Sequence, residues 1–124
     1  MSHSLKGLDV FLVEDDFLIL LDMKFILEDA GASVISAATL AQADTLSTGS
    51  FDAAVLDIRL PDGDAYALAA RLKAQNTPLI FHTGNANQAR LRQEFPEAVT
   101  LSKPISEAHL LAAVKQQSSA PVQS

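Results

Sequence analysis

The sequence predicts an α/β fold, a doubly wound (βα)5 domain with a parallel sheet of five strands. Short apolar runs alternate with helix-like runs along the chain, which is typical of a parallel sheet covered by helices on both faces. The apolar runs begin about 20 to 25 residues apart, the length of one strand and one helix with short loops. Five such units are too few for a closed barrel, which needs about eight units and about 250 residues.

The expected strands are residues 10–13, 33–37, 53–56, 79–81 and 98–101. The first, Val10-Phe11-Leu12-Val13, is apolar and rich in strand-forming residues, and it ends at an acidic cluster. The second strand is the weaker prediction, because serines interrupt its apolar residues.

The expected helices are residues 17–30, 40–46, 65–74, 85–94 and 106–117. Gly31 is expected to close the first helix, because glycine readily adopts the left-handed conformation that follows a helix. Thr39 is expected to cap the second, and Ser106 followed by Glu107 to open the last.

Length and composition allow one domain. The chain has 124 residues, of which 48% are hydrophobic and 19% charged, so neither a disordered chain nor a fibrous repeat is expected. We expect the domain to span residues 7–117 and a flexible polar tail to span residues 118–124. The absence of cysteine excludes a disulfide framework, a thiolate nucleophile and a cysteine zinc site.

The charge pattern and the start of the chain bear on partners and location. The net charge of −6, without a lysine and arginine cluster, argues against a nucleic-acid partner. The start lacks a signal-peptide pattern, and the densest apolar stretch, residues 17–21, is far too short to span a bilayer. We therefore expect a soluble, cytoplasmic protein with no membrane partner.

Polar residues follow four of the five expected strands, at the point where each strand ends. They are Glu14-Asp15-Asp16, Asp57, His82-Thr83-Gly84 and Ser102-Lys103-Pro104. Because ligands of doubly wound sheets bind at the carboxyl ends of the strands, we expect these side chains to converge on one edge. Each motif alone has a simpler interpretation as a helix cap, a turn or a solvated loop, and only their joint order indicates a site.

The chemistry of these side chains indicates phosphoryl transfer. Carboxylates of Glu14, Asp15 and Asp57 within a few ångströms repel unless a cation binds, and all-oxygen ligands suit Mg²⁺ or Mn²⁺. The Lys103 ammonium and the Thr83 hydroxyl could hold anionic phosphoryl oxygens beside them. A carboxylate left partly free could then attack phosphorus as a nucleophile.

Taken together, four motifs resemble the receiver domain of bacterial two-component response regulators over nearly the whole chain. They are Phe11-Leu12-Val13-Glu14-Asp15-Asp16, Val55-Leu56-Asp57-Ile58-Arg59-Leu60-Pro61-Asp62-Gly63, Pro78-Leu79-Ile80-Phe81-His82-Thr83-Gly84 and Leu101-Ser102-Lys103-Pro104. The resemblance implies the flavodoxin-like receiver fold. It also implies a response regulator that signals by contact with a downstream effector protein. Few residues follow the last expected helix, so we expect a stand-alone receiver without an output domain, although a domain cut from a larger protein would have the same sequence.

The resemblance also assigns roles to the residues at the strand ends. It makes Asp57 the phospho-acceptor, which takes a phosphoryl group from a sensor histidine kinase or a histidine phosphotransfer protein. Thr83 is similar to the switch hydroxyl that moves toward the phosphoryl group, and Lys103 to the lysine that pairs with it.

The same resemblance implies the ligands of Mg²⁺, with Mn²⁺ as an alternative ion. Asp15 and Asp57 would bind the ion directly, Glu14 through water, and Arg59 through its backbone carbonyl. Asp15-Asp16 could be the acidic pair instead, but the order Val-Glu-Asp-Asp favours Glu14-Asp15.

Two features depart from the common receiver pattern. Thr100 stands where receivers commonly carry a tyrosine or phenylalanine whose rotamer follows the threonine. The run Phe81-His82-Thr83-Gly84 is similar to an atypical Phe-x-Thr-Gly subgroup known from alphaproteobacteria, which also lacks that aromatic residue. The usual account of signal propagation therefore does not carry over.

We also predict the roles of residues next to the site and the buried side of the first helix. Arg59 and Asn85 would flank the path of attacking water, and His82 is expected to pack under a helix rather than bind a ligand. In the helix over residues 17–30 we assign one apolar set to the core, Leu18, Leu21 and Phe25. The surplus set, Phe17, Ile19, Leu20 and Ile26, is a candidate interface for a histidine-bearing helix or for a weak dimer of an otherwise monomeric protein.

Two other functions remain as alternatives. A degenerate receiver could act as a phosphorylation-independent binding module, although all the site positions hold competent residues. An aspartyl-phosphate phosphatase typically has a second aspartate two residues after the nucleophile, where this chain has Arg59. We therefore expect no enzyme activity beyond self-phosphorylation and autodephosphorylation.

Overall fold

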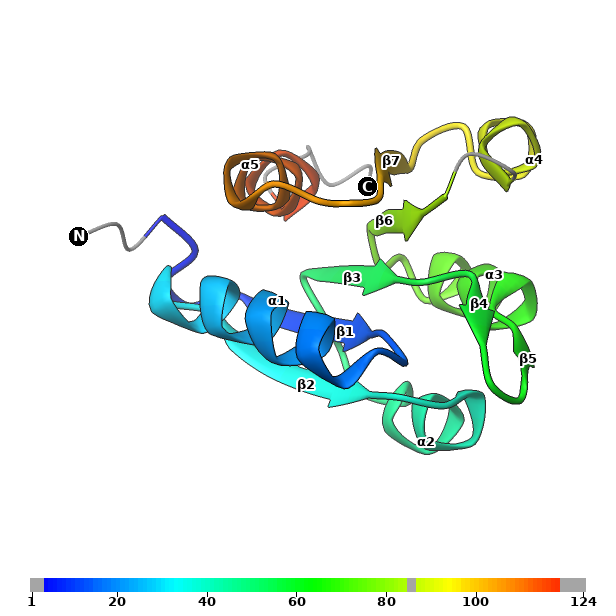
Figure 1. Ribbon diagram of the computed structural model, residues 1–124, viewed down its shortest axis with the longest axis horizontal. Coiled ribbons are helices and arrows are strands. Elements are labelled where there is room, and N and C mark those ends of the chain that lie inside the picture. Colours follow the sequence, from blue (N-terminus) through cyan, green and yellow to red (C-terminus); the bar gives the residue numbers. More distant parts are fainter. Residues whose placement is uncertain (1–3, 85–86, 119–124) are drawn as a thin grey trace.

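The computed structural model describes residues 4–84 and 87–118 (Figure 1). Its main sheet has five parallel strands in the order β2-β1-β3-β6-β7, which is a doubly wound sheet. The strands are β1 (Asp9–Val13), β2 (Ser33–Ala37), β3 (Ala53–Leu56), β6 (Leu79–Thr83) and β7 (Val99–Ser102). The helices are α1 (Phe17–Asp29), α2 (Leu40–Leu46), α3 (Tyr66–Ala74), α4 (Gln88–Glu94) and α5 (Glu107–Ser118). The predicted fold class is confirmed.

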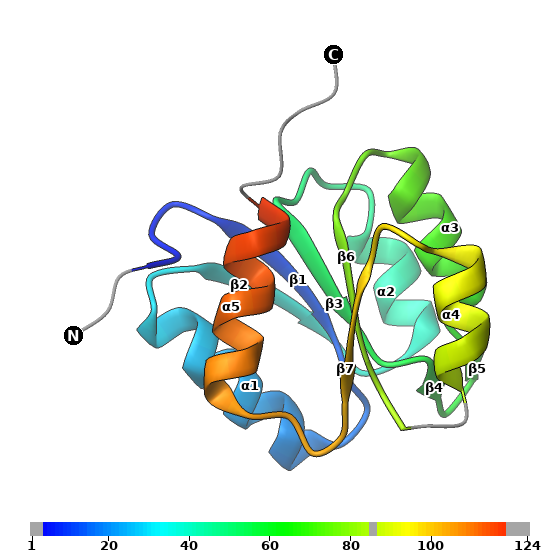
Figure 2. The ribbon, with the colours of Figure 1, turned by 90° about the horizontal axis from the view of Figure 1, so that it is seen from above.

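Helices cover both faces of the sheet and create two hydrophobic cores (Figure 2). α1 and α5 lie on one face, and α2, α3 and α4 on the other. Alternate residues of β1 point to opposite sides, so Phe11 packs in the core under α2–α4 and Leu12 in the core under α1 and α5. Burial on both faces explains why the central strands β1 and β3 are nearly continuous apolar runs, whereas the edge strand β2 is partly exposed and contains serines.

The boundaries of several helices and strands differ from those predicted from the sequence. β6 continues two residues further than expected, through His82 and Thr83, because it pairs with β7 along that length. A hairpin of β4 (Arg59–Leu60) and β5 (Gly63–Asp64) was not predicted, since strands of two residues leave no recognisable pattern. Asn85, the expected start of the fourth helix, lies outside the described residues.

Two predicted helix boundaries are confirmed. Thr39 Oγ1 accepts a hydrogen bond of 3.1 Å from the backbone N–H of Gln42 at the start of α2. Gly31, just after α1, has a φ of +104°, and a Cβ there would lie 2.9 Å from the Cα of Lys6. Of the expected tail, Ser118 is the last residue of α5, and residues 119–124 lie outside the described part.

The prediction of which α1 residues are buried was wrong. Leu18, Leu21 and Phe25 were assigned to the core, but they are 75%, 46% and 68% exposed. Ile26, assigned to the surface, is buried, while Ile19 and Leu20 are partly buried against the core. The predicted exposure of Phe17 is confirmed.

Among the described residues, no helix combines the length and the apolar character needed to cross a bilayer.

Candidate functional site

The backbone of the sheet fixes the site residues at one edge. Hydrogen bonds continue one residue beyond the strands: Glu14 N–H donates to Ala37 O at 3.1 Å, and Asp57 N–H to Val13 O at 2.9 Å. Lys103 N–H likewise donates to Thr83 O at 3.1 Å. The polar residues that follow the strands therefore start from fixed positions on neighbouring strands, as the sequence predicted.

Three carboxylates converge at this edge. Glu14, Asp15 and Asp57 each offer an oxygen, and these oxygens all lie within 4.8 Å of one another. Glu14 and Asp57 are buried and Asp15 is exposed. Such a group of like charges repels itself unless a cation or protons neutralise it.

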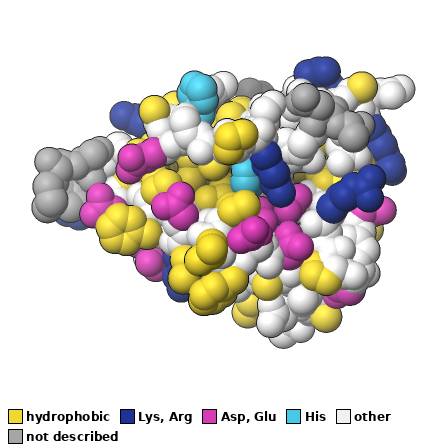
Figure 3. Space-filling view, viewed as in Figure 1, with side chains coloured by type: hydrophobic (Ala, Val, Ile, Leu, Met, Phe, Trp, Pro, Cys, Tyr) yellow, Lys and Arg dark blue, Asp and Glu magenta, His cyan; other side chains and the backbone are white. Residues whose placement is uncertain are grey.

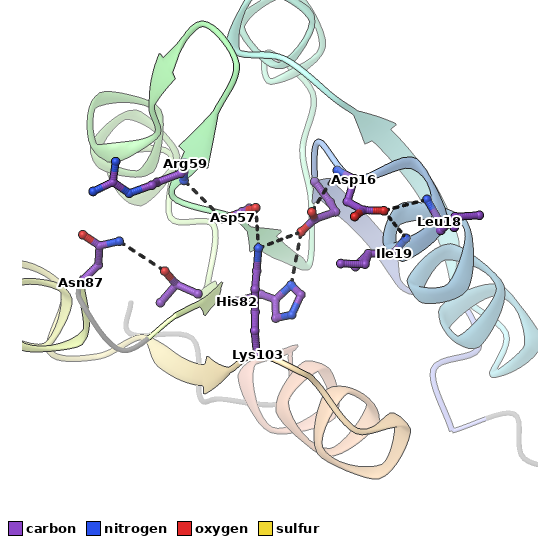
Figure 4. A network of polar contacts seen from close by, with 10 residues as sticks. Asp16, Leu18, Ile19, Asp57, Arg59, His82, Asn87 and Lys103 are labelled. Atoms are coloured by element: carbon purple, nitrogen blue, oxygen red, sulfur yellow. Dashed lines mark hydrogen bonds and ion pairs between the residues drawn. The ribbon is translucent and has the colours of Figure 1, made fainter.

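Asp16 does not belong to this group, because its side chain makes other contacts. Its Oδ1 accepts hydrogen bonds from the N–H groups of Leu18 at 3.0 Å and Ile19 at 3.2 Å, so it caps α1 (Figure 4). The acidic pair beside Asp57 is accordingly Glu14 and Asp15, the register that the sequence order favoured.

Asp57 has a partner at each oxygen. Lys103 Nζ donates to Oδ2 at 2.9 Å, and the backbone N–H of Arg59 donates to Oδ1 at 3.3 Å (Figure 4). Burial raises the pKa of Asp57, and the negative charge of Glu14 adds to this rise, while the bond from Lys103 opposes it. The Asp57 carboxylate is therefore held in surroundings that disfavour its charge.

Lys103 responds to the same excess of negative charge. Partial burial would lower its pKa, but the hydrogen bond to Asp57 and the charges of Asp57 and Glu14 outweigh burial and raise the pKa. Negative charge contributes to both raised pKa values, because a single ammonium does not balance the neighbouring carboxylates, although burial is the larger cause for Asp57. A further cation at the edge would complete the balance.

The donor set fits a hard divalent cation. Carboxylate oxygens from Glu14, Asp15 and Asp57 form a cluster that needs water to complete an octahedron, which suits Mg²⁺ or Mn²⁺. Glu14 Oε2 is buried without a hydrogen-bond partner, as expected of an oxygen that interacts with a bound ion or its water. Arg59 lies next to the cluster with an exposed side chain.

Thr83 lies at the end of β6 and is buried. Its Oγ1 accepts a long hydrogen bond of 3.5 Å from Asn87 Nδ2, and Asn87 Oδ1 accepts one of 3.5 Å from the Tyr66 hydroxyl. The guanidinium of Arg90 lies 3.6 Å from the centre of the Tyr66 ring. The sequence analysis missed these neighbours, because no local pattern brings Tyr66 of α3 to the residue that precedes α4.

A cleft of about 470 Å³ lies beside these residues. It runs between the β4–β5 hairpin and α4, and Arg59, Tyr66, Asn87 and Arg90 contribute to its walls.

His82 and Thr100 are the other two residues near the site that the sequence singled out. His82 is buried in β6, and its Nδ1 lies 3.4 Å from Glu14 Oε2. Thr100, the position without the usual aromatic residue, is half-buried in β7 opposite Phe81.

Comparison with known proteins shows clear relatives. The family model described as "Response regulator receiver domain" matches residues 10–115. Transcriptional regulatory protein CrdR of Helicobacter pylori is 32% identical over 113 residues, which cover 86% of this chain and 53% of that protein. The chain thus spans about half the length of the curated relatives it matches.

Solved structures agree over nearly the whole chain. The non-phosphorylated HemR receiver domain of Leptospira biflexa has a TM-score of 0.83 and 32% identity, covering 95% of this chain and 99% of its own. The receiver domain of sensor histidine kinase PA1611 of Pseudomonas aeruginosa has a TM-score of 0.77 and 26% identity, covering 92% and 99%. That structure has a magnesium ion coordinated in its active site cleft.

Proposed function

Because the chain belongs to the response regulator receiver domain family, we propose that it accepts a phosphoryl group on Asp57 from a phosphohistidine, in a Mg²⁺-dependent reaction. A receiver domain is a phospho-accepting signalling module of two-component systems rather than a catalytic enzyme. One observation carries the proposal: the buried Asp57 carboxylate lies within 4.8 Å of carboxylate oxygens of Glu14 and Asp15 and 2.9 Å from Lys103 Nζ.

The transfer step follows from the contacts of Asp57. One carboxylate oxygen attacks phosphorus, the N–P bond of the phosphohistidine breaks, and its electron pair returns to the imidazole nitrogen. Asp57 becomes an acyl phosphate. Lys103, whose pKa is raised by its acidic neighbours, stays charged and can pair with a phosphoryl oxygen, and the Thr83 hydroxyl can donate to another. Attack of water on phosphorus later returns the carboxylate and releases phosphate.

Mg²⁺ would be held by Asp15, Asp57, the backbone carbonyl of Arg59 and, through water, Glu14, with Mn²⁺ as an alternative ion. When bound, the ion supplies positive charge next to the phosphoryl oxygens. The magnesium ion in the PA1611 receiver supports this assignment.

We also propose that the phosphodonor docks on the exposed apolar side of α1. Phe17, Leu18, Leu21 and Phe25 form a group that we call the α1 apolar face. Hydrophobic side chains gather on the surface over α1 beside acidic side chains (Figure 3). Because α1 begins directly after the acidic cluster, a histidine-bearing helix on this face could present its phosphohistidine to Asp57. A weak dimer through the same face is the alternative.

The output would be contact with an effector protein. Thr100 and the run Phe81-His82-Thr83-Gly84 support placement in the Phe-x-Thr-Gly subgroup, in which the signal does not pass through a strand aromatic.

Intact-mass spectrometry with acetyl phosphate tests the acceptor. We expect the mass of one phosphoryl group to be gained with Mg²⁺ and not with EDTA. The gain should disappear in Asp57→Asn and persist in Asp22→Asn, which removes the same charge from an exposed position of α1. Labelling that persists in Asp57→Asn would exclude Asp57 as the acceptor. A folded wild type that takes no phosphoryl group from acetyl phosphate or from any histidine donor would favour the phosphorylation-independent binding module.

A further inference from the structure

We propose that His82 is a positioning residue for the cation site, donating a hydrogen bond from Nδ1 to Glu14 Oε2 and fixing that carboxylate for Mg²⁺. This inference rests on the proposed function, since it concerns the same Mg²⁺ site, and it adds a residue to which sequence analysis gave no role at the site.

Glu14 and His82 hold buried polar atoms without hydrogen-bond partners. Among the described residues, the buried side-chain nitrogen and oxygen atoms without a partner are Glu14 Oε2, His82 Nδ1 and His82 Nε2. Both side chains are only 1% exposed. Buried polar groups are nearly always paired in native proteins, because an unpaired one loses its hydration without compensation.

Two of these three atoms face each other. Glu14 Oε2 and His82 Nδ1 lie 3.4 Å apart, so an approach of a few tenths of an ångström makes an ordinary N–H···O hydrogen bond (Figure 4). One movement thus satisfies a donor and an acceptor together. Among the described residues Nε2 has no hydrogen-bond partner, so Nδ1 is the ring nitrogen that can orient Glu14.

The sheet explains how the two side chains meet. Glu14 follows β1 and His82 lies in β6, and the end of β3 separates these strands in the sheet. Neighbouring strands lie about 4.8 Å apart, so two long side chains are needed to bridge the gap. His82 is held at this position because β6 is buried along its length and pairs with β7, with His82 opposite Leu101.

The other contacts of Glu14 do not hold its Oε2 atom, which leaves His82 to do so. Oε1 already accepts a hydrogen bond of 3.1 Å from the backbone N–H of Asp16. Lys103 Nζ lies 3.8 Å from Oε2 but 2.9 Å from Asp57 Oδ2, so the ammonium is engaged mainly with the acceptor. A hydrogen bond from His82 would hold the Glu14 carboxylate, so that Lys103 stays free to pair with Asp57 and with the phosphoryl group. Outer partners of a metal site typically change metal affinity by about 10- to 100-fold when replaced, and Glu14, which would hold the ion through water, is itself such a partner.

Calorimetric titration of Mg²⁺ into the protein without any phosphodonor tests the proposal. In His82→Asn the amide nitrogen can take the place of Nδ1, whereas in His82→Gln it reaches the place of Nε2. We expect His82→Leu and His82→Gln to weaken Mg²⁺ binding about tenfold, the lower end of that range because His82 acts through Glu14, and His82→Asn to restore most of the affinity. His109→Leu, at an exposed position of α5, is the matched control and should bind like the wild type.

A second readout does not depend on the variants folding. In ¹⁵N NMR of the wild type, Nδ1 of His82 should carry a proton, and its resonance should shift when Mg²⁺ is added. Unchanged Mg²⁺ affinity in His82→Leu, equal losses in the Asn and Gln variants, or an Nδ1 without a proton would each overturn the proposal while the proposed function stands. A folded wild type that binds no Mg²⁺ would overturn both.

Discussion

At the scale of single residues, the proposed acceptor Asp57 is kept in an environment that costs the fold stability. Burial and the neighbouring charge of Glu14 raise the pKa of Asp57, although Lys103 opposes this effect. Functional sites often carry such a cost in stability, because groups held in surroundings that disfavour their charge are kept ready to react. The cost can be measured without any phosphodonor.

We predict that Asp57→Asn is more stable than the wild type at pH 7 in EDTA. The folded pKa lies above the value of 3.8 for the unfolded chain, so the folded protein binds more protons between these two values. Stability from this group is therefore present at low pH and is lost as the pH rises through the folded pKa. The variant lacks the charge, so its advantage should be largest at neutral pH and shrink as the pH falls toward 4.

Urea unfolding followed by circular dichroism at several pH values checks this prediction, since the chain has no tryptophan for fluorescence. Asp22→Asn serves as the control for loss of one carboxylate. A variant less stable than the wild type at pH 7 would mean that the bond from Lys103 outweighs burial.

Much of the candidate site follows from the sequence at this scale, and some of it cannot. Polar residues directly after apolar strands must gather at one edge of a parallel sheet, so Glu14, Asp57 and Lys103 could be placed without coordinates. The contact of His82 with Glu14 could not be predicted. The two residues belong to strands that are separated by β3, and the sequence does not show which side chains span that strand.

At the scale of elements, α1 shows where periodicity gives too little information. Its apolar residues cover more than one side of the helix, so the sequence pattern does not fix its rotation on the sheet. The structure buries Met23, Ile26 and Leu27 and leaves Leu18 and Phe25 in solvent. The elements themselves and their order were predictable, since strand and helix patterns alternate regularly.

The β4–β5 hairpin was not predictable, yet it joins the site to α2. Asp62, at its turn, accepts hydrogen bonds from the backbone N–H of Leu40 at 2.8 Å and of Ala41 at 3.1 Å. These bonds satisfy the first N–H groups of α2, which have no partner within the helix. The hairpin begins at Arg59, whose N–H contacts Asp57.

We predict that Asp62→Ala lowers the thermal unfolding midpoint by a few degrees while phosphorylation of Asp57 continues. The bond from Leu40 is the main cause that lowers the pKa of Asp62 below 3.8; burial opposes it, and the bond from Ala41 adds to the lowering. A lowered folded pKa contributes stability above the unfolded value, which is lost as the pH falls through the folded pKa. The difference between wild type and variant should thus be full at pH 7 and decrease below about pH 3.8.

Thermal melts of Asp62→Ala and of Asp22→Ala, an exposed α1 control, test this role. Equal midpoints for the wild type and Asp62→Ala would show that solvent replaces the cap at no cost.

At the scale of the whole molecule, the helices cover the two faces of the sheet but not the edge at which the strands end. α1 and α5 cover one core and α2, α3 and α4 the other, and the acidic cluster lies at the edge between these layers. The α1 apolar face borders that edge, whereas Leu46 of α2, also exposed, lies on the opposite side of the sheet. This difference allows donor docking to be separated from the chemistry of the acceptor.

We predict that a Leu18→Glu, Phe25→Glu variant loses phosphotransfer from a histidine donor protein but keeps its uptake from acetyl phosphate. The two side chains are 75% and 68% exposed, so charges there should cost little stability but should oppose burial under a partner helix. Loss of about 1.4 kcal/mol of docking energy slows transfer about tenfold at low donor concentration. The donor would be the phosphorylated histidine protein that transfers fastest to the wild type in a panel.

Leu46→Glu is the control, because it places one glutamate on an exposed leucine of the other face and should leave both reactions unchanged. Sedimentation of the wild type and the double variant over a range of concentrations distinguishes the dimer alternative. If the double variant transfers normally from the histidine donor but no longer self-associates, the α1 apolar face is a contact between two copies of this chain. If both donors fail equally, the substitutions disturb the acidic cluster that α1 follows, and docking cannot be inferred from them.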